Sequence, residues 1–241
     1  MTRELLDALL AVLLAPSCAA CNEPLLHPTQ GCVCPACWNA IIPTLPPFCT
    51  RCGGHISQAN AALITPLCPQ CIGVVSSVAA SRAAGEHVGS LRAILHALKY
   101  DGRRSLAAPL AALMRSAGSE LLVSCEAAVP VPLHPARRRE RGFNQADDLA
   151  HNIGLRVIRA LKRTRHTATQ TALPAQERLA NVEGAFVASR DARHIRGRAV
   201  LLIDDVRTTG ATLEACAKVL REAGAREVCA LTAARVEAPA A

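Results

Sequence analysis

Apolar and polar residues alternate along the chain in a pattern that predicts buried strands and amphipathic helices. The run Val200–Ile203 is wholly aliphatic, which is typical of a strand buried on both faces. Residues 211–223 have helical spacing, and Gly224 follows as a residue suited to the left-handed position after a helix. Between them stand Asp204 and Asp205 and a hydroxylated, glycine-containing stretch. We therefore predict a strand, a loop and a helix, with the charged and hydroxylated residues in the loop.

The same alternation runs through the chain that precedes this segment. Strands that alternate with helices favour a parallel sheet flanked by helices, the α/β class. In chain order, the pattern predicts a strand at Val78–Arg82, helices on both sides of 100–102, a strand at Ala127–Val131, a helix from Asn144 onward, a helix at Ala175–Asn181 and a strand at Ala185–Ala188.

The apolar N-terminus superficially resembles a secretion signal. Glu4 and Asp7 offset Arg3, the apolar run is short, and no leucine stands three residues before Cys18. The leucines fit one broad face of a helix, so we predict a helix docked on the rest of the protein. No stretch is long enough to span a bilayer, and we expect a cytoplasmic protein without membrane insertion. The leucines of this face are Leu5, Leu6, Leu9, Leu10, Leu13 and Leu14.

Composition and charge narrow the possible partners. Of the 241 residues, 51% are hydrophobic, which supports a folded core and excludes a disordered chain. The net charge of +8 favours anionic partners such as phosphates, pyrophosphate or nucleic acid, although a solvated basic surface would carry the same charge. Aromatic residues make up only 2%, so stacking platforms for single-stranded nucleic acid are scarce.

Cysteines dominate the first third of the chain. Eight of the 12 form four C-x-x-C pairs, and two such pairs supply the four thiolates of a tetrahedral zinc site. We predict two structural sites from sequential pairing, although an interleaved pairing and an iron–sulfur or redox role remain alternatives. Cys32 is expected to be a bystander, and Cys125, Cys216 and Cys229 are expected to be buried hydrophobes. The predicted ligands are Cys18, Cys21, Cys34 and Cys37 for one site and Cys49, Cys52, Cys68 and Cys71 for the other.

The stretch after Val200–Ile203 has the chemistry of a phosphate site. A helix N-terminus attracts phosphate, and small residues let backbone N–H groups approach it closely. Two acids beside a phosphate fit if they accept hydrogen bonds from sugar hydroxyls or help to hold Mg²⁺. The loop after Ala127–Val131 carries Arg137, Arg138, Arg139 and Arg141, which suit an anion.

The stretch Val200–Thr212, VLLIDDVRTTGAT, closely resembles the phosphoribosyl pyrophosphate (PRPP) motif of type I phosphoribosyltransferases. Together with the cysteine pairs, further landmarks narrow the resemblance to the ComF family, which joins an N-terminal zinc ribbon to a type I phosphoribosyltransferase domain. Arg207 is a departure, because many members have an apolar residue there. The landmarks are Leu98-Lys99-Tyr100, Val131-Pro132-Leu133, Arg141-Gly142-Phe143-Asn144-Gln145, Thr169-Gln170 with Arg178 and Asn181, and Ile203 through Thr212.

The resemblance implies a division into residues 1–75, with a double zinc ribbon, and residues 76–241, with a PRPP-binding domain. It implies PRPP with Mg²⁺ as the ligand and gives a role to each group of site residues. Asp204 and Asp205 would act as catalytic residues that bind the ribose. The 5′-phosphate would be bound by Arg207, Thr208, Thr209, Gly210, Ala211 and Thr212. The pyrophosphate would face Lys99, Arg137, Arg139 and Arg141. A flap at Thr169 and Gln170 would shield the site, although a plain surface loop has the same composition.

Three function classes follow from the resemblance. The first is an enzyme that transfers phosphoribose to an unknown acceptor and releases pyrophosphate. The second is a PRPP sensor or adaptor without turnover. The third is a nucleic-acid-binding protein of competence, with single-stranded DNA or the DNA-uptake machinery as its partner. Only turnover with pyrophosphate release separates the first two, and a steep salt dependence of DNA affinity would mark the third.

Overall fold

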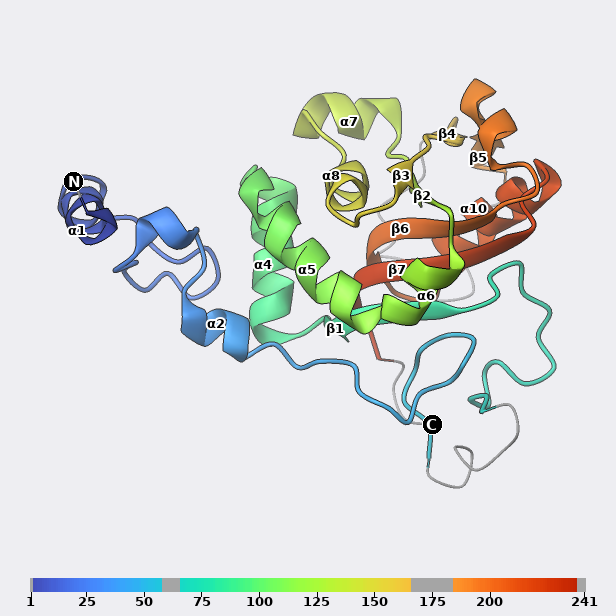
Figure 1. Cartoon of the computed structure of the whole chain (residues 1–241), viewed down its shortest axis with the longest axis horizontal. Coiled ribbons are helices and arrows are strands. Elements are labelled where there is room, and N and C mark those ends of the chain that lie inside the picture. The colour runs from blue at the N-terminus through green and yellow to red at the C-terminus, as the bar shows by residue number, and fades with distance from the viewer. Residues whose placement is uncertain (1, 58–65, 166–183, 238–241) are drawn as a thin grey trace.

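A five-stranded parallel sheet forms the centre of the structure (Figure 1). It is a computed structural model that describes residues 2–57, 66–165 and 184–237. The spatial order of the strands is β1-β7-β6-β2-β3, so β6 and β7 lie at the centre. The strands are β1 (Ser81–Glu86), β2 (Ala127–Pro130), β3 (Arg156–Val157), β6 (Ala199–Arg207) and β7 (Glu227–Arg235).

Helices cover both faces of this sheet. Successive residues of β6 point to opposite faces, so Leu201 and Ile203 join one hydrophobic cluster, and Val200 and Leu202 join the other. The first cluster packs under α4 (Gly89–Tyr100), α5 (Ala107–Ala117), α6 (Ser119–Ser124) and α8 (Gln145–His151). The second packs under α10 (Ala211–Glu222) and an antiparallel pair, β4 (Leu161–Arg163) with β5 (Phe186–Ala188).

The predicted helices and most predicted strands are present within the described residues. The first strand is a partial miss, because β1 runs from Ser81 to Glu86 and the prediction stopped at Arg82. The extra residues include alanine and glycine, which carry little strand propensity. Their small size is needed, because a Cβ on Gly85 would lie 2.6 Å from the carbonyl oxygen of Ile42, which packs against this edge of the sheet. The helix predicted at Ala175–Asn181 lies outside the described residues.

The N-terminal helix α1 (Arg3–Leu14) forms as predicted but is not docked as predicted. Leu5, Leu9 and Leu13 are 61%, 49% and 69% exposed, and the helix lies at one end of the molecule, away from the sheet (Figure 1). It is attached mainly through Asp7, whose buried carboxylate accepts a hydrogen bond of 2.8 Å from the N–H of Thr29. A carboxylate needs such a partner when it is buried, and the face of α1 that carries Asp7 is the one turned toward Thr29. Among the described residues, no helix has the length and apolarity to cross a membrane.

The cysteine-rich segment has little regular structure of its own. It contains the 3₁₀ turn η1 (Pro28–Gln30) and the short helix α2 (Pro35–Asn39), which contacts α4. Two further 3₁₀ turns, η2 (Arg104–Leu106) and η4 (Arg190–Ile195), connect elements of the sheet domain. Residues 42–44 run along the outer edge of β1, where Pro43 forms an isolated bridge with Gly85.

Candidate functional site

The paired acids lie inside β6 and not in the loop after it, which corrects the prediction. β7 continues to Arg235 and supplies pairing partners as far as Arg207, so β6 extends past the acids. Because successive residues of a strand face opposite sides, Asp204 and Asp205 leave the sheet in opposite directions. Both nevertheless border one cavity of about 330 Å³ at the carboxyl end of the sheet, hereafter the main cavity.

Asp205 lies in a strongly cationic environment. Its carboxylate forms a buried ion pair with the Nζ of Lys99, at the last turn of α4, and accepts a 3.5 Å hydrogen bond from Gln145 Nε2. Burial raises the pKa of Asp205, but the Lys99 ammonium outweighs this effect and holds the pKa below its usual value. Asp205 is therefore a carboxylate at neutral pH.

Asp204 has the opposite electrostatics. Burial and the neighbouring charge of Asp205 raise its pKa well above the ordinary value. Its Oδ1 accepts a 2.9 Å hydrogen bond from the N–H of Asp205, which only partly offsets the cost of burial. The adjacent acids thus differ in their affinity for a proton. A cation or a hydroxyl donor that enters the cavity would favour the ionised form of Asp204.

The loop after β6 reaches the main cavity through some of its residues only. Arg207, Thr208, Gly210 and Thr212 border the main cavity. Thr209 and Ala211 instead border a second cavity of about 310 Å³ behind the loop, hereafter the rear cavity. Gly210 is the N-cap of α10 with a φ of +85°, and as a glycine it offers no capping side chain. The Thr209 hydroxyl accepts a 3.4 Å hydrogen bond from the N–H of Ala211. A helix N-terminus without an N-cap side chain, beside hydroxyl groups, suits a phosphate.

The arginine-rich segment is a short helix, α7 (Pro135–Arg141), and not the predicted loop. Residues four apart share a helix face, so Arg137 and Arg141 both border the main cavity. Arg139 is exposed and does not border it, which corrects its assignment to the same anion site. The guanidinium of Arg141 lies 5.1 Å from the ring centre of Tyr100 and donates a 2.6 Å hydrogen bond to Gln145 Oε1.

A third cavity of about 450 Å³, hereafter the side cavity, shares Lys99, Tyr100, Arg137 and Arg141 with the main cavity. Its three cations therefore all border the main cavity as well. Three cations around neighbouring cavities suit a ligand with more than one negative charge. The side cavity is bordered by Lys99, Tyr100, Gly102, Arg137, Glu140, Arg141 and Phe143.

Three residues of the main cavity were missed by the sequence analysis. His87 follows β1, whose end was predicted too early, and burial together with Lys99 lowers its pKa. Gln145 was seen only as part of a motif, although its amide contacts Asp205. Arg163 on β4 also borders the cavity, and no local pattern marked it. Thr169 and Gln170, the predicted flap, lie outside the described residues.

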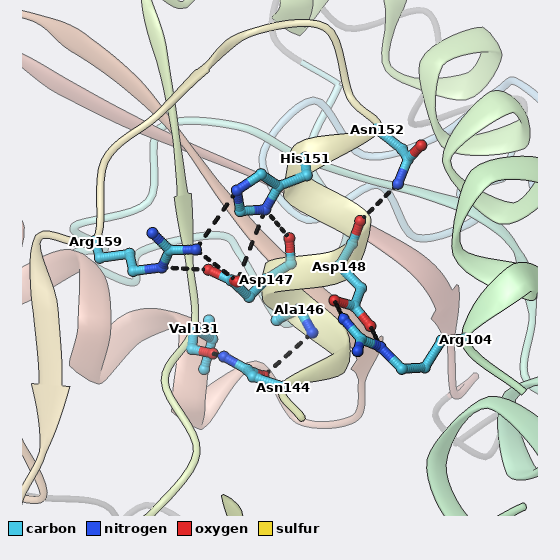
Figure 2. A network of polar contacts seen from close by, with 9 residues as sticks. All are labelled: Arg104, Val131, Asn144, Ala146, Asp147, Asp148, His151, Asn152 and Arg159. Atoms are coloured by element: carbon cyan, nitrogen blue, oxygen red, sulfur yellow. Dashed lines mark hydrogen bonds and ion pairs between the residues drawn. The ribbon is translucent and has the colours of Figure 1, made fainter. Parts of the chain in front are cut away.

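Ion pairs fix the helix that carries Gln145. The helix predicted from Asn144 onward is present, and this residue caps α8 by accepting a 3.2 Å hydrogen bond from the N–H of Ala146 (Figure 2). Figure 2 shows Arg159 bound to Asp147, and Arg104 bound to Asp148 through two hydrogen bonds of 2.7 Å. The ion pair between Arg104 and Asp148 joins α8 to the turn η2, which follows α4. This network therefore holds the α8 N-terminus against the carboxyl end of the sheet.

The eight paired cysteines form two clusters with sequential pairing, as predicted. Cys18, Cys21, Cys34 and Cys37 form the first site, and Cys49, Cys52, Cys68 and Cys71 form the second. Cys32 belongs to neither cluster. Cys125, Cys216 and Cys229 are buried, also as predicted.

The geometry of both clusters fits tetrahedral zinc. Zn–S distances of about 2.3 Å separate the sulfurs of such a site by about 3.8 Å. The Sγ atoms of Cys21 and Cys34 are 3.9 Å apart, and those of Cys52 and Cys68 are 3.7 Å apart. Burial raises the pKa of the Cys18 thiol, but three backbone N–H donors outweigh it and lower the pKa to about 6. Donors of this kind favour thiolate, the form that binds a metal.

Two segments of the chain match known domain families. Residues 9–75 match the double zinc ribbon domain, and residues 140–240 match the phosphoribosyl transferase domain. The chain is 30% identical to Competence protein F of Haemophilus influenzae over 213 residues, which cover 84% of this chain and 90% of that protein. It is 31% identical to the DNA utilization protein YhgH of Salmonella typhimurium over 224 residues, with coverages of 88% and 93%.

Similarity to solved structures is limited. A structure described as the allosteric regulatory enzyme of purine biosynthesis superposes with a TM-score of 0.34 at 23% identity. The superposed part covers 53% of this chain and 26% of the chain of that enzyme.

Proposed function

This chain belongs to the ComF family, and we propose that its main cavity binds PRPP together with Mg²⁺. One observation carries the proposal: the acids of β6, the N-terminus of α10 and the cationic face of α7 border a single cavity. PRPP has two ribose hydroxyls, a 5′-phosphate and a pyrophosphate, and each finds a matching surface there. The match of residues 140–240 to the phosphoribosyl transferase domain supports the same ligand.

Each part of the ligand has its own set of residues in the proposal. Asp204 and Asp205 accept hydrogen bonds from the ribose hydroxyls. The loop Thr208–Thr212 and the α10 N-terminus bind the 5′-phosphate, because backbone N–H groups and a partial positive charge favour an anion there. Lys99, Arg137 and Arg141 bind the pyrophosphate. The division at residue 75 into a ribbon and a PRPP-binding domain is part of the proposal.

Mg²⁺ fits this site only in company with the ligand. The described residues contain no group of three or more acids and histidines that could hold a metal, apart from the cysteine clusters. The carboxylate of Asp205 is already paired with Lys99, and the carboxylate of Asp204 is the remaining hard oxygen donor of the pair. When bound with PRPP, Mg²⁺ would supply charge neutralisation on the pyrophosphate.

The chemistry that we propose is transfer of phosphoribose. The bond between ribose C1 and the pyrophosphate oxygen breaks, pyrophosphate leaves with the electron pair, and an acceptor nucleophile bonds to C1. Charge develops on the leaving group, so fixed guanidinium groups at Arg137 and Arg141 stabilise the transition state more than the ground state. The acids hold the sugar in place while the nucleophile approaches.

The experiment is calorimetric titration of PRPP with Mg²⁺ into zinc-loaded protein. We expect binding by the wild type and a loss of at least about 100-fold in affinity in Asp204→Asn/Asp205→Asn, since hydrogen bonds to charged groups contribute about 1.5–3 kcal/mol each. Asp191→Asn, at an exposed acid outside the cavity, should bind as the wild type does. No binding by the folded wild type would refute the proposal. Pyrophosphate release with candidate acceptors then separates an enzyme from a PRPP sensor without turnover.

Asp204→Asn by itself should reduce binding without reducing stability. The folded pKa of Asp204 lies above 3.8, its ordinary value, so its favourable contribution is complete below pH 3.8 and is lost as pH rises through the folded pKa. Removing the buried charge should therefore leave the melting temperature at pH 7.5 equal or higher, and the difference should vanish near pH 3.5. A drop of more than about 4 °C at pH 7.5, the effect of about 1 kcal/mol or more, would contradict this role.

Binding of single-stranded DNA is a second candidate function. The net charge of +8 and the names of the relatives, Competence protein F and DNA utilization protein, support a link with DNA uptake. DNA affinity that falls steeply with salt and survives Asp204→Asn/Asp205→Asn would support it. DNA affinity that is lost together with PRPP affinity in that variant would place both ligands in the main cavity.

A further inference from the structure

The second cysteine cluster lies directly behind the loop that follows β6. Cys52 and Cys71 of this cluster border the rear cavity, and so do Arg207, Thr209 and Gly210 of the loop. The ligands of the first cluster border neither the main nor the rear cavity. In the described part of the chain, only one of the two metal sites therefore adjoins the proposed phosphate loop.

Three arginines bind the knuckle that begins the second cluster. They come from β1, β7 and β6, which are consecutive in the sheet. Each guanidinium donates a hydrogen bond to a backbone carbonyl between residues 50 and 53. The bonds are Arg82 to Thr50 at 3.0 Å, Arg207 to Cys52 at 2.6 Å and Arg235 to Gly53 at 2.6 Å.

The knuckle approaches the sheet so closely that only glycine fits at position 53. A Cβ on Gly53 would lie 2.5 Å from the backbone carbonyl oxygen of Ser81, whereas one on Gly54 would lie 2.8 Å from the Arg235 guanidinium, the end of a flexible side chain. Backbone therefore packs directly on the sheet domain at this point. A shift of the knuckle would move the carbonyl groups that the arginines bind.

Arg207 connects this knuckle to the loop itself. Its Nη1 donates to the carbonyl of Cys52, which is a predicted zinc ligand. Its Nη2 and Nε lie 3.0 and 3.1 Å from the point where a Cβ on Gly210, the N-cap of α10, would be. One guanidinium thus binds the second metal site and lies beside the start of the helix that faces the main cavity.

A second connection joins the same two elements. The carboxylate of Glu214, in the first turn of α10, accepts 2.7 Å hydrogen bonds from the Ser76 hydroxyl and from the N–H of Ser77. These residues follow the last cysteine of the second cluster. The first turn of α10 is therefore held from the ribbon on two sides.

We propose that Arg207 is a positioning residue that couples zinc in the second site to PRPP in the main cavity. The proposal rests on the proposed function. Zinc fixes the four thiolates, and so fixes the Cys52 carbonyl that orients Arg207 against Gly210. Without the metal the knuckle loses this geometry and the loop loses its support. Because coupling between two sites is reciprocal, bound PRPP must raise the affinity of the second site for zinc. We expect the tighter binding to appear as slower loss of zinc from that site.

The test measures zinc loss from each site separately in the full-length, zinc-loaded protein. A chelator removes zinc while N-ethylmaleimide alkylates the thiols that are released, and peptide mass spectrometry assigns each alkylated cysteine to its cluster. We expect saturating PRPP with Mg²⁺ to slow alkylation of the second cluster about tenfold, within the usual range of coupling between sites. Alkylation of the first cluster should be unchanged, which makes it an internal control.

Two variants locate the coupling. In Arg207→Met, PRPP affinity should fall about tenfold, and saturating PRPP should no longer slow zinc loss from the second site. Arg51→Met is the matched control, because Arg51 also donates to the carbonyl of a cluster cysteine, Cys71, at 2.7 Å, but not to the loop. It should release zinc faster than the wild type both with and without PRPP. The ratio of its rates of zinc loss without and with PRPP, hereafter the PRPP-dependent ratio, should equal that of the wild type. Arg207→Lys retains the charge and should show an intermediate ratio, even if Arg207→Met does not fold.

The outcomes separate this proposal from the one on which it rests. No PRPP binding by the wild type overturns both. PRPP binding with an unchanged rate of zinc loss from the second cluster overturns the coupling alone. A PRPP-dependent ratio that persists in Arg207→Met overturns the role of Arg207.

Discussion

Asp204 and Asp205 are neighbours in sequence whose pKa values are shifted in opposite directions. The ion pair with Lys99 holds the pKa of Asp205 down, whereas burial and the charge on Asp205 raise the pKa of Asp204. The pair thus has one carboxylate that a cation stabilises and one whose ionised form is disfavoured by its surroundings. A ribose hydroxyl and a ligand-bound cation are both suited to that second group.

The substitution Lys99→Met should destabilise the protein by roughly 3 kcal/mol at pH 7, since it leaves Asp205 buried and unpaired. The folded pKa of Asp205 lies below 3.8, so its contribution is present above pH 3.8 and is lost as pH falls through the folded pKa. The deficit should accordingly be largest near neutral pH and disappear only as the pH falls below 3.8. Thermal melts between pH 2 and 8 measure it.

Lys218→Met, at an exposed position of α10, is the control and should have little effect. A deficit of the same size at every pH would indicate lost packing of the lysine stem and not the loss of an ion pair.

At the scale of elements, close contact between a knuckle and a sheet determines how the ribbon sits on the domain. Gly53 and Gly73 belong to the same ribbon and have nearly the same backbone conformation, with φ of +68° and +71°. A Cβ on Gly53 would meet the Ser81 carbonyl at 2.5 Å, whereas nothing lies within 4 Å of one on Gly73. The two positions therefore separate conformational strain from steric contact.

We expect Gly73→Ala to cost about 1 kcal/mol, the penalty of a left-handed conformation with a side chain. Gly53→Ala should cost about 2–4 kcal/mol, because the clash adds about 1–3 kcal/mol to the same penalty. Urea denaturation of the zinc-loaded protein measures both. Equal losses would mean that the knuckle moves away from β1 without cost.

For the whole molecule, two hydrophobic clusters on the faces of one sheet carry the stability, and the N-terminal helix contributes little. Leu98 is fully buried under the sheet, whereas Leu9 and Leu13 on α1 are 49% and 69% exposed. A leucine-to-alanine change should therefore lower the free energy of unfolding far more at Leu98 than at Leu9 or Leu13. The position of α1 at one end of the molecule agrees with this difference (Figure 1).

Leu98→Ala should lower the free energy of unfolding by about 3 kcal/mol, because it removes buried apolar area and leaves a cavity. Leu9→Ala and Leu13→Ala should each change it by less than about 0.5 kcal/mol. Denaturant midpoints provide the comparison. A loss above about 2 kcal/mol at Leu13 would show that α1 packs on the protein in solution.

The sequence by itself determined the features that depend on neighbouring residues. The strand, loop and helix around Asp204, the cap at Asn144 and the cysteine knuckles follow from periodicity, capping and ligand spacing, which operate over a few residues. The α/β class and the order of elements followed from the same local patterns. The motif residues of the main cavity were therefore largely predictable.

Only the tertiary structure decided which distant residues meet. The extension of β6 through the acids depends on β7, and the Arg207 bond to Cys52 joins residues 155 positions apart. α7 places Arg137 and Arg141 at the cavity and leaves Arg139 exposed, a choice that depends on helix formation in a segment with no helical pattern of apolar residues. In α1 likewise, the tertiary structure buries Asp7, with the Thr29 N–H as its hydrogen-bond donor, and leaves Leu5, Leu9 and Leu13 exposed.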